Sequence, residues 1–192
     1  MTMLNKVLVL LARGFEETDV STVTRALRRA GRSVAVVGLR AGAVQGAYGL
    51  SLAPDCPLSE VEMELPRAVV LPGGVQGTRR FAADPRVHRL LRRVIEQGGY
   101  VLAIDTAYSI LLSAGVLDPG GCRSNGGPGE ESADRPVFGR GPEMGFLRAA
   151  DGLPSERVLV QGHVIFGRDS GSAQEAALTL ASLLESEVRV GC

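Results

Sequence analysis

A single acidic residue, Asp105, stands where an apolar run of strand length meets a segment with helical spacing. The run covers residues 100–104, and the apolar residues 110–112 that follow lie at helical positions. With no loop between the two elements, the chain must turn sharply at Asp105. Such an elbow exposes one side chain and aims the next backbone N–H groups at whatever binds there. Because buried strands seldom carry a bare carboxylate without a partner or a function, we interpret Asp105 as the reactive position.

A structural role for Asp105 is the alternative. Its carboxylate could cap the helix that follows and accept hydrogen bonds from the N–H groups of the first turn. Both interpretations place the carboxylate at the same junction, and the residues of the elbow alone leave both open.

The elements that must position Asp105 alternate between strands and helices. Residues 6–11 form an apolar strand, acidic residues open the helix that follows, and a second strand comes next. A strand–helix–strand unit of this kind starts a parallel sheet. We expect parallel strands at 6–11, 33–39, 66–71 and 100–104, and helices at 16–30, 84–97 and 173–185.

Four further segments are less regular. Residues 44–52 predict a hairpin with a glycine-rich turn, and Pro54 and Pro57 indicate a loop. Residues 158–166 predict either a hairpin or one broken strand. Residues 120–140 are rich in Gly, Pro and Ser, which is typical of an excursion over the surface.

The composition indicates one globular domain, residues 1–192, with 45% hydrophobic and 22% charged residues. Lys+Arg and Asp+Glu are equal at 21 each, and the arginines are scattered, so we expect neither a nucleic-acid nor a membrane partner. Cys56, Cys122 and Cys192 have no disulfide or metal spacing, and we expect no metal or cofactor. No stretch has transmembrane length or a signal-peptide pattern, which favours a cytoplasmic protein.

Five motifs resemble those of the ThiJ/PfpI superfamily, which includes the parkinsonism-associated deglycase. They are the opening strand and acidic turn (residues 7–17), the first helix end (28–31), the proline-glycine-glycine loop (69–74), the elbow (102–107) and the late arginine-glycine segment (168–172). The resemblance covers nearly the whole chain. It implies an α/β three-layer sandwich around a mostly parallel sheet, flavodoxin-like or class I glutamine amidotransferase-like, and a homodimer.

The elbow departs from the pattern of that superfamily. Its relatives usually carry a cysteine nucleophile where this chain has Asp105, and an acidic residue in the first loop, matched here by Asp19, holds that cysteine. Relatives also commonly carry a histidine about twenty residues past the elbow, where the nearest match is Asn125. Thiolate chemistry at the elbow is therefore not expected.

The resemblance implies that Asp19 and Asp105 lie close enough to share a proton. Two carboxylates at short range cannot both ionise cheaply, so we expect one pKa to rise and the other to fall. Such a pair can donate and accept protons without a metal. The backbone N–H groups of Gly74 and Thr106, beside Gly73, would form an anion site that matches the oxyanion site of the superfamily.

Other side chains could line the site. Glu16 could contact a ligand or be a solvated first-turn charge, and Tyr108 could donate its hydroxyl or lie in the core. Arg168 could bind a ligand carboxylate, contact the other side of a dimer or form a surface ion pair. His163 is interpreted as a core histidine, and Cys122 could approach the site from the variable segment.

Two functions fit these residues. The first is a cofactor-independent enzyme that uses Asp19 and Asp105 in acid-base chemistry on a small carbonyl-containing or unsaturated metabolite. The reaction would be a hydration, dehydration, isomerisation or cyclisation, and the loss of the cysteine suggests a specialised substrate of secondary metabolism. The second is a non-catalytic ligand-binding, regulatory or protective protein. The chain has no helix-turn-helix segment that would favour a transcription regulator.

Overall fold

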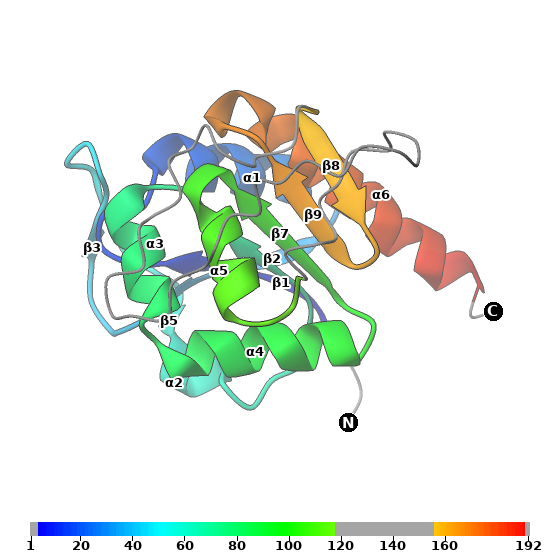
Figure 1. The fold of residues 1–192 in the computed structure, drawn as a ribbon, viewed down its shortest axis with the longest axis horizontal. Coiled ribbons are helices and arrows are strands. Elements are labelled where there is room, and N and C mark those ends of the chain that lie inside the picture. The colour runs from blue at the N-terminus through cyan, green and yellow to red at the C-terminus, as the bar shows by residue number, and fades with distance from the viewer. Residues whose placement is uncertain (1–3, 118–155, 191–192) are drawn as a thin grey trace, which may run out of the picture.

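The computed structural model of the chain describes residues 4–117 and 156–190. A mostly parallel sheet of seven strands runs through its centre in the order β5-β2-β1-β6-β7-β9-β8 (Figure 1). These strands are β1 Leu4–Leu11, β2 Ser33–Gly38, β5 Cys56–Pro57, β6 Pro66–Leu71, β7 Tyr100–Ile104, β8 Val158–Gln161 and β9 Val164–Gly167. The helices are α1 Glu17–Arg29, α2 Leu58–Val61, α3 Val75–Ala82, α4 Pro85–Glu96, α5 Tyr108–Ser113 and α6 Ala173–Val190.

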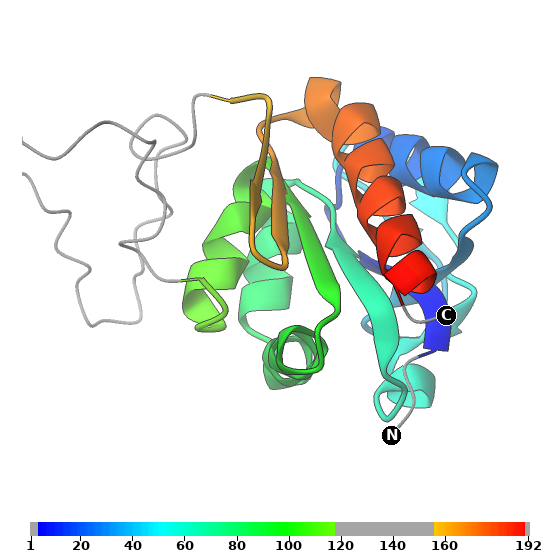
Figure 2. The same ribbon diagram turned by 90° about the vertical axis from the view of Figure 1, so that its right-hand side faces the viewer.

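Helices cover both faces of the sheet, as Figure 2 shows edge-on. Along β1, the side chains of Val7, Val9 and Leu11 pack with α1 and α6, whereas those of Leu8 and Leu10 pack with the cluster that α4 and α5 join. A strand that buries both faces reads as a continuous apolar run, which explains the pattern in the sequence. The three-layer α/β architecture is confirmed.

The carboxyl ends of the central strands meet at one edge of the sheet. Strand β1 pairs in parallel with β2 and β6, β6 with β7, and β7 with β9. The register joins Leu71 to Ala103 and Ile104 to Gly167, so the segments that follow β6, β7 and β9 emerge together. Open parallel sheets bind ligands at this edge.

The expected parallel strands are confirmed, as is the hairpin at 44–52, whose strands are β3 Val44–Gln45 and β4 Ser51–Leu52. Residues 158–167 form an antiparallel hairpin rather than one broken strand. The expectation of a loop around Pro57 was wrong, because Cys56 and Pro57 form the edge strand β5 and α2 follows directly. Edge strands tolerate proline, which gives up one ladder hydrogen bond. Helix α3 was not anticipated, and α6 extends past the expected end at residue 185.

The hairpin formed by β3 and β4 is fastened to the loop between β1 and α1. Gly14 N–H donates to Gln45 O at 2.8 Å, and Ala47 N–H donates to Phe15 O at 2.8 Å. The Glu17 carboxylate accepts a third hydrogen bond, from Tyr48 N–H, at 2.8 Å. These three hydrogen bonds hold the loop before α1, and the start of α1, against the hairpin.

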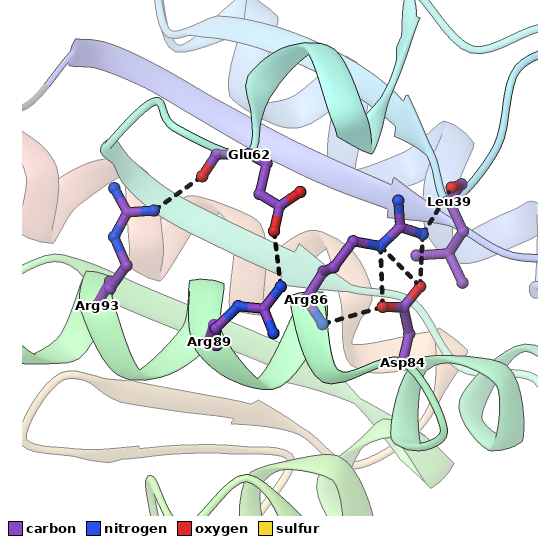
Figure 3. Close-up of polar contacts among 6 residues, drawn as sticks. All are labelled: Leu39, Glu62, Asp84, Arg86, Arg89 and Arg93. Carbon is purple, nitrogen blue, oxygen red and sulfur yellow. Dashed lines mark hydrogen bonds and ion pairs between the residues drawn. The ribbon is translucent and has the colours of Figure 1, made fainter.

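Helix α4 begins at a charged cap. The Asp84 carboxylate accepts the backbone N–H of Arg86 at 2.9 Å and its guanidinium at 2.6 Å, while that guanidinium also donates to Leu39 O at 3.0 Å (Figure 3). The cap thus joins the start of α4 to the end of β2. The hydrogen bond from the Arg86 side chain is the main reason that the pKa of Asp84 is lowered.

Two further arginines of α4 bind the segment after α2. Arg89 forms an ion pair with the Glu62 carboxylate at 2.8 Å, and Arg93 donates to Glu62 O at 2.8 Å (Figure 3). These arginines therefore have structural partners on a neighbouring helix end. Within the described ranges, no helix is long and apolar enough to cross a membrane.

We predict that Asp84→Ala lowers the free energy of unfolding by about 1–2 kcal/mol, the usual cost of losing a helix N-cap. Because the folded-state pKa is lowered, the ionic part of this contribution is present above the unfolded pKa, about 3.9, and is lost as the pH falls through the folded value. Urea unfolding at neutral and acid pH measures both effects. Glu60→Ala, at an exposed position of α2, should change stability by less than about 0.5 kcal/mol. An Asp84→Ala protein as stable as wild type at neutral pH would contradict the prediction.

Candidate functional site

Asp105 lies directly after β7, in a strained backbone conformation. Its φ is +50°. Among the described residues, Asp105 is the only non-glycine residue with a positive φ. It opens a short 3₁₀ turn, Asp105–Ala107, that leads into α5. A left-handed conformation costs a non-glycine residue about 1–2 kcal/mol, and such strain gathers at functional sites. The expected sharp elbow is confirmed.

The alternative role of Asp105 as a helix cap stays a prediction. The N-cap residues of the 3₁₀ turn and of α5 are Ile104 and Ala107, and neither has a side-chain cap hydrogen bond. Burial and the charge of Asp169 raise the pKa of Asp105, whereas hydrogen bonding from the backbone of Thr106 lowers it. The Asp105 side chain is half-buried.

Asp19 reaches the same edge of the sheet from the first turn of α1. Its side chain is fully buried, with 0% exposed. Oδ2 accepts the backbone N–H of Gly73 at 2.8 Å, whereas Oδ1 has no hydrogen-bond partner. In return, the N–H of Glu16 donates to Gly73 O at 2.9 Å. The loop after β1 and the loop after β6 are thus tied together at Gly73.

Gly73 separates the two aspartates. A Cβ atom built on it would lie 2.9 Å from Asp19 Oδ2 and 3.3 Å from Asp105 Cβ. Only glycine leaves room for both side chains. Gly74 follows with a φ of +101°, its Cα against the loop of Gly14 and Glu16. Gly73 therefore lies against both aspartates, and a proton shared between their carboxylates stays a prediction.

The pKa of Asp105 is raised above its ordinary value. Burial is the main cause, because it penalises the charged form, and the negative charge of Asp169 adds to it. The Thr106 amide opposes both effects.

The pKa of Asp19 is raised as well, again mainly by burial. The nearby Ser170 hydroxyl and the hydrogen bond from Gly73 N–H lower this pKa, and the charges of Asp105 and Asp169 raise it. The expectation that one pKa of the pair would rise and the other fall was wrong. Both carboxylates are removed from water and a third carboxylate lies near, so the charged form of each is disfavoured.

Glu16 belongs to the same acidic group. It is half-buried, and burial is the first cause of its raised pKa, followed by the charges of Asp19 and Glu17. Asp105 also raises it slightly. Glu16 is thus partly exposed beside the carboxylates of the site, and both interpretations of it, ligand contact and solvated charge, stay predictions.

The hydroxyl and aromatic candidates are packed against neighbours. Thr106 Oγ1 lies 3.0 Å from Oγ1 of the buried Thr78, and either hydroxyl could be the donor. Tyr108 is 6% exposed and meets Phe166 edge-on, with ring centroids 5.0 Å apart. These contacts favour a core role for the ring of Tyr108. The anion site at the N–H groups of Gly74 and Thr106 stays a prediction.

The remaining candidates differ in position. Arg168 is exposed just after β9, at the same edge of the sheet as Asp105. His163 lies in the turn between β8 and β9, before the start of β9, with its ring 5.0 Å from that of Tyr100. Asn125 and Cys122 lie outside the described residues.

Sequence reasoning missed three residues of the site. Thr78 lies one turn into α3, a helix that the sequence pattern did not predict. Asp169 and Ser170 belong to the late arginine-glycine segment, in which only Arg168 was a candidate site residue. Asp169 caps the short turn Ser170–Ser172 through a hydrogen bond from Ser172 N–H at 2.9 Å. A cap signal was visible in Asp169 followed three residues later by Ser172.

No metal centre is apparent in the described part of the chain. Within residues 4–117 and 156–190, no three or more His, Cys, Asp and Glu side chains are arranged to hold a metal ion. The carboxylates of the site act on one another as charges without converging as ligands.

A mostly parallel, three-layer α/β sheet with a sharp elbow at its carboxyl edge is the architecture of the ThiJ/PfpI class. The chain belongs to the DJ-1/PfpI family, whose model matches residues 5–138. It is similar to protein dj-1beta of Drosophila melanogaster, with 31% identity over 95% of this chain and 91% of that protein. The crystal structure of Drosophila DJ-1beta superimposes with a TM-score of 0.74 at 29% identity, covering 95% of this chain and 91% of that chain.

Enzymes are among the similar proteins. A deglycase of Pyrococcus horikoshii is 31% identical over 58% of this chain and 67% of its own length. A glutathione-independent glyoxalase of Caenorhabditis elegans is 26% identical over 88% of this chain and 83% of its own length.

We predict that Asp105→Asn leaves the stability unchanged or raises it. A carboxyl group with a raised folded-state pKa penalises the folded state once the pH exceeds the unfolded value, so removing the charge helps at neutral pH and makes no difference in acid. Melting temperatures of both proteins across this pH range measure the effect. A loss of more than about 1 kcal/mol at neutral pH would show that the carboxylate stabilises the elbow.

Proposed function

We propose that the protein is an enzyme of the DJ-1/PfpI family that uses Asp19 and Asp105 in acid-base chemistry on a small carbonyl-containing or unsaturated metabolite. The observation that carries this proposal is the placement of both aspartates against Gly73, one fully buried and one half-buried. Both pKa values are raised toward the range in which a carboxyl group can donate a proton as well as accept one.

The two aspartates have different roles in this proposal. Burial favours the neutral form most strongly at Asp19, which holds the shared proton, and Asp105 is the more accessible base. Asp105 takes a proton from carbon or water, and the proton held by the pair is returned to another atom of the substrate. The charge on the pair is restored at the end of the cycle, so no cofactor is consumed. Hydration, dehydration, isomerisation and cyclisation all follow this scheme.

The developing negative charge on the substrate needs hydrogen-bond donors. In the proposal, the N–H groups of Gly74 and Thr106 supply them, since both residues follow the ends of neighbouring parallel strands. Removing one such donor in other enzymes costs about 10²–10³ in rate.

Elbow thiol chemistry, by contrast, has no nucleophile here. Among the described residues, Cys56 is the only cysteine, and it lies on the edge strand β5. Burial raises the pKa of its thiol, which lowers the thiolate fraction. The replacement of a thiol at the elbow also suits a second candidate, a non-catalytic ligand-binding or protective member of the family, in which Asp105 binds without turning over.

We predict that Asp105→Asn and Asp19→Asn each lower kcat/KM by roughly 10²–10⁴-fold, because each removes a titrating proton while keeping the shape. The double variant should lose much less than the product of the two single losses, because the residues act as a unit. Turnover is measured over a panel of small carbonyl and unsaturated compounds, with Glu60→Gln as the matched loss of a remote carboxylate. Full activity in Asp105→Asn would remove this residue from the mechanism, and binding without turnover in wild type would favour the second candidate.

We further predict that alkylation of the cysteines leaves turnover largely intact. The thiol of Cys56 is remote from the elbow, and the elbow itself has no sulfur. Mass spectrometry counts the modified thiols while activity is followed in the same sample. Stoichiometric loss of activity at one cysteine, with the fold retained, would overturn the carboxylate mechanism.

A further inference from the structure

The charges that surround the two aspartates are all of one sign. Every charged neighbour that shifts the pKa of Glu16, Asp19 or Asp105 is another carboxylate. These neighbours come from α1, from the elbow and, through Asp169, from the segment after β9. The loops of three parallel strands thus concentrate negative charge at one point of the sheet edge.

Two arginines near this edge of the sheet form hydrogen bonds with groups other than the aspartates. Arg13 donates to Gln45 Oε1 at 3.3 Å, and Arg80 donates to Arg13 O at 2.9 Å and to Gln76 O at 3.0 Å. Arg168 is exposed and has interactions of its own. Among the described residues, the charged groups that shift the pKa of either aspartate are carboxylates.

Asp19 adds an acceptor that the protein does not use. The side chain is fully buried, Oδ2 is bound by Gly73 N–H, and Oδ1 makes no hydrogen bond. The Ser170 hydroxyl is near enough to lower the pKa of Asp19, but the two groups do not form a hydrogen bond of normal geometry. A buried carboxylate oxygen without a donor is costly, and a ligand that brings a donor would remove the cost.

We propose that the substrate carries a positively charged nitrogen, as an ammonium, amidinium or protonated imine, that donates to the carboxylates of Asp19 and Asp105. This inference rests on the proposed function and narrows it to nitrogen-containing substrates. Because Gly73 has no side chain, none stands between Asp19 Oδ2 and Asp105 Cβ, and in this proposal one donor group binds both carboxylates. A substrate with a carboxylate or phosphate at this position would meet like charge on every side.

A charged nitrogen would also prepare the reaction. It favours the ionised form of the nearest carboxylate, so binding the correct substrate would lower the raised pKa of that group and favour its action as a base. A neutral or anionic compound of the same size would not lower this pKa. Substrate selection and activation of the base would then be one event.

Three small probes of matched size test the inference: ethanolamine, ethylene glycol and glycolate. They share a hydroxymethyl group and differ in the charge of the other end. Each is titrated into ¹⁵N-labelled protein at neutral pH while the amide signals of Gly73, Gly74 and Thr106 are followed. Ethanolamine should bind roughly tenfold more tightly than ethylene glycol, the difference expected of one charge-assisted hydrogen bond, and glycolate should not shift these signals.

Two variants assign the preference to the site. Asp105→Asn should bring ethanolamine and ethylene glycol to similar affinities, whereas Glu60→Gln, which removes an equal charge from exposed α2, should keep the difference. Equal binding of the two probes to wild type, or binding of glycolate at these amides, would overturn the inference. If Asp105-dependent turnover is then found only with uncharged compounds, the acid-base function stands without it. If the ammonium preference holds but no compound is turned over, the site binds cations and the catalytic proposal fails.

Discussion

The exchange of hydrogen bonds at Gly73 is the contact on which the site depends. Gly73 N–H donates to the Asp19 carboxylate, and Gly73 O accepts the N–H of Glu16. Gly73, in the loop after β6, thereby holds the start of α1 through two hydrogen bonds, as a donor in one and as an acceptor in the other. Without this exchange, the side chain of Asp19 would have no reason to stay buried, since a carboxylate leaves water only when hydrogen bonds replace part of its hydration.

Three features that destabilise the fold lie together at the site. The backbone at Asp105 is left-handed, Asp19 Oδ1 is buried without a donor, and the negative charges of Asp105 and Asp169 act on Asp19. Each of these features lowers the stability of the fold, and none is needed to build the sheet. Natural proteins keep such features mainly where they serve binding or chemistry. The sheet can carry the cost because its core on both faces is apolar and fully buried.

The sequence predicts the architecture of this protein better than the state of its site. Continuous apolar runs predict the buried strands. The elbow at Asp105 is visible because strand and helical patterns meet without a loop. The role of Asp19 came from the resemblance rather than from its own surroundings. The pKa of each aspartate could not be foreseen, since it depends on burial and on Asp169, which reaches the site only through the parallel pairing of β7 with β9. Similarly, α3 was missed because Gly77 weakens its helical pattern, yet it carries Thr78 to within 3.0 Å of Thr106.

The left-handed backbone at Asp105 has a consequence for how the family can change. Aspartate and asparagine adopt this conformation more readily than most residues other than glycine, because a short polar side chain can interact with the nearby backbone. A carboxylate can therefore occupy the elbow without any rearrangement of the strand or of the helix behind it. In evolutionary terms, the backbone of the elbow sets the direction of the side chain, and this direction does not depend on which residue occupies the position. An ancestor with one kind of reactive group could acquire another by a single residue exchange, with the second partner, Asp19, already in place.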